Sequence, residues 1–380
     1  MPDRSKKSHR TILHDMLCLP TAPFAEHFVI EHILAFCAAR KNLFVTRDAV
    51  GNLLVRLRQG GARVARPVCI TAHLDHPGFV AERMIGAGKV RAFWRGGVPK
   101  EYFVNSGVRF FVDGRWVRGR IRTVKIKALG ERKRVHTAEI DVARDVPEGA
   151  IGMWDFPDPQ IRGSRIHARG CDDIAGASAM LCCIDTLCRS RQPCDAYFLF
   201  TRAEEVGFVG AIAAARRKTI PKKCFVVAME TSSERPNAKL GDGPILRVGD
   251  RTTTFTHAAT AHCLQAALAV GKADKKFKFQ RRLMDGGTCE SSAYCALGYE
   301  ATGLCVALGN YHNVDGKRKK LAPEYIDLND FDNMVKWFVE LARGRLAYTG
   351  QDTGFVKQLA ETETYYEKLL NDTIRPRPNR

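Results

Sequence analysis

An apolar run that ends in two adjacent glutamates constrains the fold of this chain more than any other stretch. Residues 196–201, Ala-Tyr-Phe-Leu-Phe-Thr, predict a β-strand that is buried on both faces. Glu204 and Glu205 follow it after Arg202 and Ala203. Ligands bind at the carboxyl ends of strands in open α/β sheets, and two carboxylates placed there repel each other unless a cation or a shared proton compensates. The alternative is a solvated pair that opens the helix expected over residues 208–218.

Other strands end in a similar way. Three more apolar runs predict buried strands over 67–72, 224–229 and 303–308, and they lead to His73, Glu230 and His312 respectively. Asp172 precedes a helix expected over 174–189. Several ionisable groups that converge on one edge of a sheet are costly unless opposite charge compensates them. A pair of divalent cations would do so, since zinc and similar metals bind imidazole nitrogen and carboxylate oxygen.

Two further carboxylates fit supporting roles around such a centre. Asp75 lies two residues after His73, where a carboxylate can orient an imidazole that ligates a metal. Glu204 would remain free of metal beside Glu205, placed to take a proton from an attacking water and return it to a leaving amine.

The order of predicted elements indicates an α/β fold with an inserted β domain. Strands and helices alternate on both sides of residues 81–163, while this segment has short β-prone runs separated by Gly, Asp and Pro. We expect a catalytic domain formed by 1–80 and 164–350, the insert at 81–163, and a C-terminal helix with a basic tail at 351–380. Other helices are predicted over 24–40, 257–270, 286–297 and 328–348, and a hairpin over 43–57.

Charge and cysteine content narrow the function classes. The net charge is +19, and the basic runs at 115–134, 272–282 and 317–320 contain few aromatic residues, so a solvated surface is favoured over a nucleic-acid groove. No stretch approaches the roughly 20 apolar residues of a membrane span, and the N-terminus does not read as a signal peptide. Thirteen cysteines without a C-x-x-C pair indicate reduced thiols in the cytoplasm.

The residues around these positions resemble a known family, the dinuclear zinc aminopeptidases of the glutamyl and deblocking type. Some members are labelled endoglucanases, and members often assemble into tetrahedral particles. The matching stretches lie at 72–80, 170–176, 200–210, 239–247, 250–251, 286–288 and 311–312. The resemblance runs in unbroken order from about Leu13 to Tyr348. It implies a three-layer α/β/α zinc-peptidase domain interrupted by a PDZ-like β domain.

The resemblance also implies roles for individual residues. One metal would be held by His73, Asp172 and Glu230, and the other by Asp172, Glu205 and His312, with Asp172 as the bridge. Glu204 would be the general base and Asp75 the partner of His73. The peptide bond between Asp172 and Asp173 is expected to be cis. The chain departs from the family in having Glu230 where many members have Asp, Ile174 where Arg is usual, and Cys289 where Asp is common.

The expected function is therefore that of a cytoplasmic aminopeptidase that acts on short peptides with two divalent ions, zinc first, with cobalt or manganese as alternatives. The resemblance implies a homo-oligomer between a dimer and a dodecamer; no membrane partner is expected.

Two other hypotheses for the function stay open. One is a carboxypeptidase or N-acyl-amino-acid deacylase with the same kind of site, and the other is an inactive scaffold that binds nucleic acid through its basic surface. His76, His167, His257 and His262 are interpreted as structural or surface residues, and Asp250 and Arg251 as either substrate anchors or capping and ion-pair residues.

Overall fold

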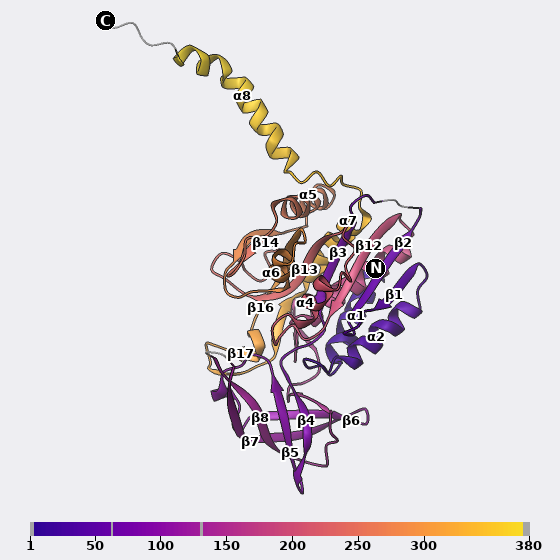
Figure 1. The fold of residues 1–380 in the computed structure, drawn as a ribbon, viewed down its shortest axis with the longest axis vertical. Coiled ribbons are helices and arrows are strands. Elements are labelled where there is room, and N and C mark those ends of the chain that lie inside the picture. Colours follow the sequence, from indigo (N-terminus) through magenta and orange to yellow (C-terminus); the bar gives the residue numbers. More distant parts are fainter. Residues whose placement is uncertain (1–3, 62–63, 130–131, 375–380) are drawn as a thin grey trace, which may run out of the picture.

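A single mixed β-sheet forms the body of the protein, with helices on both faces (Figure 1). The computed structural model describes residues 4–61, 64–129 and 132–374. The eight strands lie in the order β1-β2-β12-β3-β13-β16-β14-β15. Neighbours from β12 through β3 and β13 to β16 are parallel, while β1, β2 and β14 join antiparallel. The predicted α/β architecture is thus confirmed.

The central strands are buried because both faces of the sheet are covered. Every residue of β3, β12 and β16 is buried, as their unbroken apolar sequences predict. The sheet strands are β1 (Leu43–Arg47), β2 (Leu53–Gln59), β3 (Val68–His73), β12 (Cys194–Thr201), β13 (Phe225–Ser233), β14 (Ile245–Asp250), β15 (Gln280–Met284) and β16 (Ala301–Leu308).

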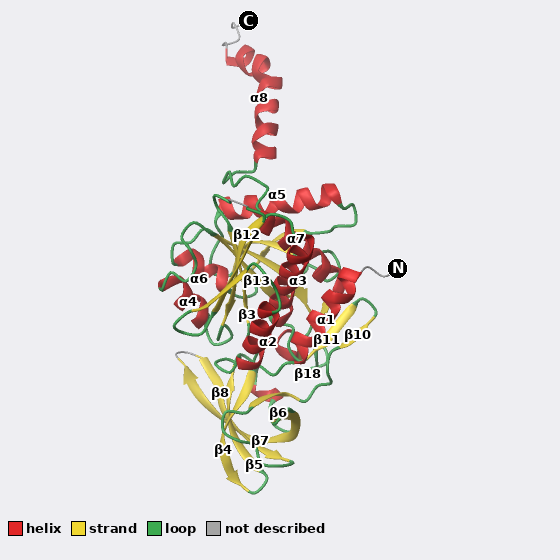
Figure 2. Cartoon of the chain, turned by 90° about the vertical axis from the view of Figure 1, so that its right-hand side faces the viewer, coloured by secondary structure: helices red, strands yellow, loops and turns green. Residues whose placement is uncertain are grey.

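Seven helices cover the described sheet in two layers (Figure 2). The larger layer packs into the main hydrophobic core and contains α1 (Arg4–Cys18), α2 (His27–Ala38), α3 (Ile174–Ser190), α5 (His257–Ala273) and α7 (Leu328–Arg343). The opposite face carries α4 (Val209–Arg216) and α6 (Glu290–Ala296) over a second core. The sequence pattern does not predict the helix α1.

Several predicted boundaries are wrong for local reasons. The helix predicted over 328–348 ends at Arg343 because Gly344 adopts a left-handed conformation with φ of 59°. The helix predicted from residue 24 begins at His27, since Phe24 has a φ of 66°. The helix predicted over 286–297 is the shorter α6, which begins only at Glu290.

The insert closes into a six-stranded barrel of order β4-β5-β8-β7-β6-β9. The strands are β4 (Gly78–Gly86), β5 (Lys89–Arg95), β6 (Gly107–Val112), β7 (Arg115–Leu129), β8 (Arg132–Val142) and β9 (Ile151–Trp154), with a short 3₁₀ helix η1 (Lys100–Tyr102). Phe79, Trp94, Phe103 and Trp154 fill the barrel with mutual ring contacts at 4.6–6.2 Å. The barrel therefore has its own hydrophobic core.

Short elements connect the barrel to the body. A small sheet joins β10 (Gln160–Arg162), β11 (Arg165–Ala168) and β19 (Glu324–Asp327). After β16 the chain forms the 3₁₀ turn η2 (Tyr311–Asn313) and a hairpin of β17 (Val314–Asp315) and β18 (Lys320–Leu321).

The last helix, α8 (Thr353–Ile374), extends away from the body (Figure 1). Its apolar side chains are exposed, including Leu359, Tyr366 and Leu370. The basic tail predicted beyond it, at 375–380, lies outside the described residues. Among the described helices, none is long and apolar enough to cross a membrane.

Candidate active site

The ionisable residues singled out from the sequence lie together at the carboxyl edge of the sheet. His73 is the last residue of β3, Glu204 and Glu205 lie in the turn after β12, Asp172 precedes α3, and His312 lies in η2 after β16. Glu230 differs from the prediction, because β13 does not stop there but continues to Ser233, paired with Leu308 of β16. The side chain nevertheless reaches the same edge as His73.

Two groups of three ligand-type side chains share Asp172. The Nε2 atom of His73 lies 3.5 Å from Oδ1 of Asp172 and 3.5 Å from Oε1 of Glu230. The Nε2 atom of His312 lies 3.1 Å from Oε2 of Glu205 and 3.8 Å from Oδ2 of Asp172. Each set offers ligand atoms that lie within 4.8 Å of one another. Asp172 thus presents one oxygen to each imidazole, which is the arrangement a bridging carboxylate requires.

The hydrogen bonds of the two imidazoles fit metal ligation. In His73, Nδ1 lies 3.0 Å from the carbonyl oxygen of Asp75, and in His312, Nδ1 lies 2.9 Å from the carbonyl oxygen of Gly97 in the insert. A carbonyl accepts only, so each Nδ1 donates, and each Nε2 offers its lone pair to a metal when the imidazole is neutral. Both Nε2 atoms are buried and have no hydrogen-bond partner among the residues that the structure describes. These two unpartnered nitrogens face the carboxylates, so the residues fit a pair of cations.

The electrostatics of the cluster also call for positive charge. Burial, reinforced by the charge of Asp172, raises the pKa of Glu230 to about 8. Burial alone would lower the pKa of His312, but the adjacent Glu205 carboxylate raises it to about 10. Glu230 and His312 therefore hold protons when no metal ion is bound. Bound divalent cations would replace these protons.

Glu204 lies beside this centre with its carboxylate at 3.9 Å from Nε2 of His73. Burial raises its pKa well above the usual range, against the opposing effect of the nearby His73. The side chain also forms a third possible ligand group with His73 and Glu205. The pair is not a solvated helix start, since Glu204 is buried and α4 begins only at Val209.

Asp75 contacts His73 differently from the prediction. The backbone carbonyl of Asp75 accepts the imidazole N–H, while its carboxylate lies 3.7 Å from that nitrogen. The carboxylate instead accepts the backbone N–H groups of Glu204 at 2.9 Å and Glu205 at 3.1 Å. Its side chain therefore orients the turn that carries both glutamates, because two backbone donors point at it from across the sheet edge.

Comparison with known proteins agrees with this arrangement. The sequence model of the family described as M42 glutamyl aminopeptidase matches residues 51–315, a span that includes all five residues of the two groups. The chain belongs to the M42 family. It is therefore a peptidase, and the resemblance noted in the sequence is confirmed. Peptidases of this family are metal-dependent, in agreement with the ligand-type groups at the sheet edge.

Individual relatives of this M42 chain are distant in sequence but similar in fold. A protein of Acetivibrio thermocellus, provisionally named an aminopeptidase, is 22% identical over 77% of this chain and 86% of its own. The TET1 peptidase of Pyrococcus horikoshii is 21% identical, with a TM-score of 0.69 over 88% of this chain and 99% of its own. An aminopeptidase of Desulfurococcus kamchatkensis is 20% identical, with a TM-score of 0.72 over 91% of this chain and 97% of its own.

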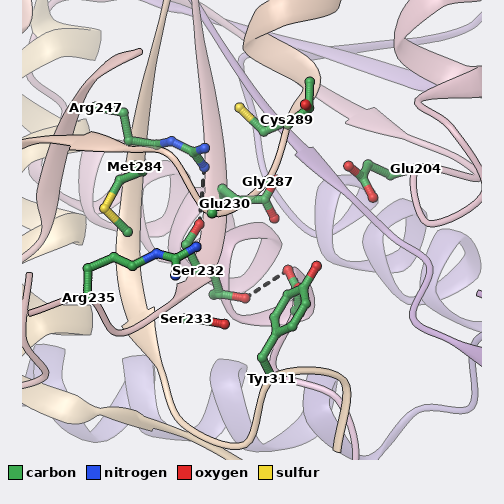
Figure 3. A pocket seen from close by; sticks show the side chains of 14 residues that line it. Glu204, Glu230, Ser232, Ser233, Arg235, Arg247, Met284, Gly287, Cys289 and Tyr311 are labelled. Carbon is green, nitrogen blue, oxygen red and sulfur yellow. Dashed lines mark hydrogen bonds between the residues drawn. The ribbon is translucent and has the colours of Figure 1, made fainter. Parts of the chain in front are cut away.

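A small cavity opens beside the centre of this M42 chain (Figure 3). It has a volume of about 80 Å³, and Asp172, Glu204, Glu230 and Tyr311 contribute to its wall. The close-up shows Arg235 and Arg247 across the cavity from Glu204. The guanidinium of Arg247 is buried and donates from Nη1 to Oγ of Ser232 at 3.1 Å. The cavity is thus acidic on one side and basic on the other.

Sequence reasoning missed a buried glutamate that supports the site. The Oε2 atom of Glu324 in β19 accepts the backbone N–H groups of Cys171 at 2.6 Å and Asp172 at 3.1 Å, and Oε1 accepts that of His312 at 2.8 Å. Thr231 also donates to Oδ1 of Asp172 at 2.8 Å. No apolar run precedes Glu324 in the sequence, so no pattern singled it out.

Other residues considered from the sequence have structural environments. His76 bonds the carbonyl of Asp172 at 2.8 Å and Asn313 at 3.1 Å. Asp250 accepts the backbone N–H groups of Thr252 and Thr253 in its own turn and that of Cys289, the residue before α6. The peptide bond between Asp172 and Asp173 is cis, as the resemblance implied.

The family departures lie in two environments. Ile174 packs in the main core. Cys289 lines the cavity, and burial raises the pKa of its thiol to about 12, so this thiol remains protonated.

Proposed function

We propose that the protein is a metal-dependent aminopeptidase that removes N-terminal residues from short peptides. The observation that carries the proposal is the pair of buried, unpartnered Nε2 atoms of His73 and His312, each facing one oxygen of Asp172. His73, Asp172 and Glu230 would hold one divalent ion, and Asp172, Glu205 and His312 the other. Zinc suits these donors, and cobalt and manganese are accepted by the same ligand types.

Bound cations would polarise the scissile carbonyl and lower the pKa of an attacking water. Glu204 performs the proton transfers in this proposal. Its carboxylate lies in the cavity wall without the close imidazole contacts of Glu205 and Glu230, and burial raises its pKa well above the usual range. Asp75 keeps Glu204 in place through the backbone N–H bond.

The size of the cavity supports removal of single residues. The cavity beside the ligands has a volume of only about 80 Å³, so we assign it to the first residue of a peptide. A peptide would therefore bind with its amino end in the cavity and the remainder of the chain outside.

We also propose a homo-oligomer in the cytoplasm. The oligomer is supported by the fold relative TET1, which can assemble into a tetrahedron or an octahedral shell. A cytoplasmic location is supported by the thirteen cysteines. All of them are free thiols, and most are buried.

Replacement of Glu204 tests the mechanism. Glu204→Gln keeps the shape of the side chain but removes the base, so turnover of aminoacyl anilides should fall by about two to four orders of magnitude. Metal content, measured by elemental analysis, should stay at the wild-type value. Glu361→Gln on α8 is the matched control and should retain full activity, because Glu361 is exposed far along the projecting helix.

A panel of substrates distinguishes the proposed aminopeptidase from the alternative functions. Hydrolysis of N-acetyl amino acids or of C-terminal residues, with anilides untouched, would indicate a deacylase or carboxypeptidase. Full activity of Glu204→Gln at unchanged metal content would refute the assigned base. A wild-type protein that binds no stoichiometric metal and hydrolyses nothing would support the scaffold reading.

A further inference from the structure

A second, much larger groove adjoins the catalytic cavity. Its volume is about 880 Å³, compared with about 80 Å³ for the cavity itself. Residues 156–167, residues 308–325 and the end of β13 form its walls. Ser233 and Tyr311 line both spaces, so the groove begins where the cavity opens.

Among the described residues, four cationic side chains line this groove without a carboxylate partner. Arg162 and Arg165 project from the β10–β11 hairpin, and Lys317 and Lys320 from the β17–β18 hairpin. Arg162 donates to the neutral amide of Gln160 at 2.7 Å, and Arg165 lies 5.1 Å from the ring centre of Tyr325. Within the part of the chain that the structure describes, neither lysine has an acidic group within 4.0 Å.

The acidic residues of the same groove are already engaged. Asp158 is held by Arg169 at 2.8 Å and by Arg109 at 3.3 Å. Asp315 pairs with Arg318, whose Nη1 atom lies 3.8 Å from its Oδ2 atom. The remaining acid, Glu234, accepts the backbone N–H of Leu240 at 3.0 Å, which leaves its charge in place, but this single carboxylate is outnumbered by the four cations. The uncompensated charge in the groove is therefore positive.

The walls that carry these cations are anchored to folded parts of the chain. Val314 and Leu321 of the β17–β18 hairpin pack against the core of the inserted barrel. Strand β11, next to β10, pairs with β19, the strand that contains Glu324. The positive groups are thus set at defined positions relative to the metal-ligand cluster, although their side chains are exposed.

We propose that this groove binds the part of the peptide that lies downstream of the scissile bond, and that its cations recognise carboxylates there. The inference rests on the proposed aminopeptidase function. Such an enzyme accommodates one residue on the amino side of the cut and all others beyond it, so the small and large spaces match the two parts of the substrate. A carboxylate in the groove comes either from the free C-terminus of a short peptide or from acidic side chains of a longer one.

Peptide pairs test this specificity on the metal-loaded, full-length protein. All begin with the residue whose anilide is hydrolysed fastest. One pair is a tetrapeptide as free acid and as amide, and the other is a tetrapeptide amide with Glu or Gln at the third position. We expect kcat/KM to be about three- to tenfold higher for the carboxylate member of at least one pair, mainly through KM, since each exposed charge pair contributes up to about fivefold. The pair that responds identifies the source of the carboxylate.

A double substitution assigns the effect to the groove. Lys317→Gln with Lys320→Gln should bring the ratio of kcat/KM within the responding pair close to one. Hydrolysis of an anilide, which carries no carboxylate downstream of the scissile bond, serves as the reference and should change much less. The matched control, Lys222→Gln with Lys223→Gln, removes the same charge from exposed positions before β13, at the opposite edge of the sheet. The control should keep the full preference.

Three results would overturn the proposal. Equal kcat/KM within both wild-type pairs would show that no carboxylate is recognised. An equal loss of preference in the control variant would assign the effect to the overall charge of +19 and not to the groove. Absence of anilide hydrolysis by the wild-type enzyme would refute the aminopeptidase function itself, and the groove proposal with it.

Discussion

Glu324 offers a sharp test of how the candidate centre is held together. Its two carboxylate oxygens accept three backbone N–H groups, from Cys171, Asp172 and His312. The carboxylate thereby joins two segments that each carry a proposed metal ligand. His312 itself has a left-handed φ of 51°, a conformation that needs support from its surroundings. Glu324→Gln keeps the size of the side chain and replaces one accepting oxygen with a donating NH₂ group.

The magnitude of the effect follows from the number of donors left without a partner. If the NH₂ group faces His312, one buried N–H loses its acceptor; if it faces the other segment, the N–H groups of Cys171 and Asp172 both lose theirs. Each unsatisfied buried group costs about 1–3 kcal/mol. The better orientation leaves one, so we expect the free energy of unfolding to fall by about 2–3 kcal/mol once the weaker, uncharged acceptor is included. Misplacement of Asp172 and His312 should also weaken zinc binding about 10- to 100-fold.

Urea denaturation and competitive zinc titration measure the two quantities. Glu361→Gln serves as the control, since Glu361 is exposed and its nearest cation, Lys357, lies at 3.7 Å on the same helix. It should change the free energy of unfolding by less than about 0.5 kcal/mol. Unchanged stability together with unchanged zinc affinity in Glu324→Gln would refute the role assigned to this glutamate.

Two more predictions concern stability away from the centre. Burial lowers the pKa of His262 to about 4, so this imidazole stabilises the fold above its unfolded pKa of about 6.5 and loses that contribution as the pH falls toward 4. Lowering the pH from 7.5 to 4.5 should reduce the free energy of unfolding by about 2.5 kcal/mol through this group. His262→Gln should remove that part of the pH dependence, measured by urea unfolding at each pH. An unchanged dependence of the free energy of unfolding on pH in this variant would contradict the prediction. In Gly210→Ala, the new Cβ would lie 2.4 Å from the carbonyl oxygen and 2.6 Å from the nitrogen of Arg202, which should cost about 1–3 kcal/mol by thermal unfolding. Gly86→Ala, with open space around it, should be neutral, and equal stability of the two variants would refute the packing argument.

The sequence alone determined the order of buried strands and the chemistry at their ends. Burial on both faces requires an unbroken apolar run, which is a local property that can be read directly, as in β3, β12 and β16. Polar residues just after such runs reach the carboxyl edge of the sheet, so the convergence of His73, Glu205 and His312 follows from the order of residues in the chain. The boundaries of the division into domains, and the roles of the site residues, stay predictions.

The tertiary structure alone decided which groups support that edge. Glu324 lies 152 residues from Asp172 in the chain, and the amides it bonds carry no sequence signature. The carboxylate of Asp75 accepts two backbone N–H groups from residues 129 and 130 positions away in the chain. Glu230 lies within β13 and not at its end, because β16 continues to pair with β13 beyond it. The cations of the groove likewise come from separate hairpins. Strand order is encoded locally in apolar runs, whereas the partner of a buried polar group depends on which distant segments the fold brings within hydrogen-bonding distance.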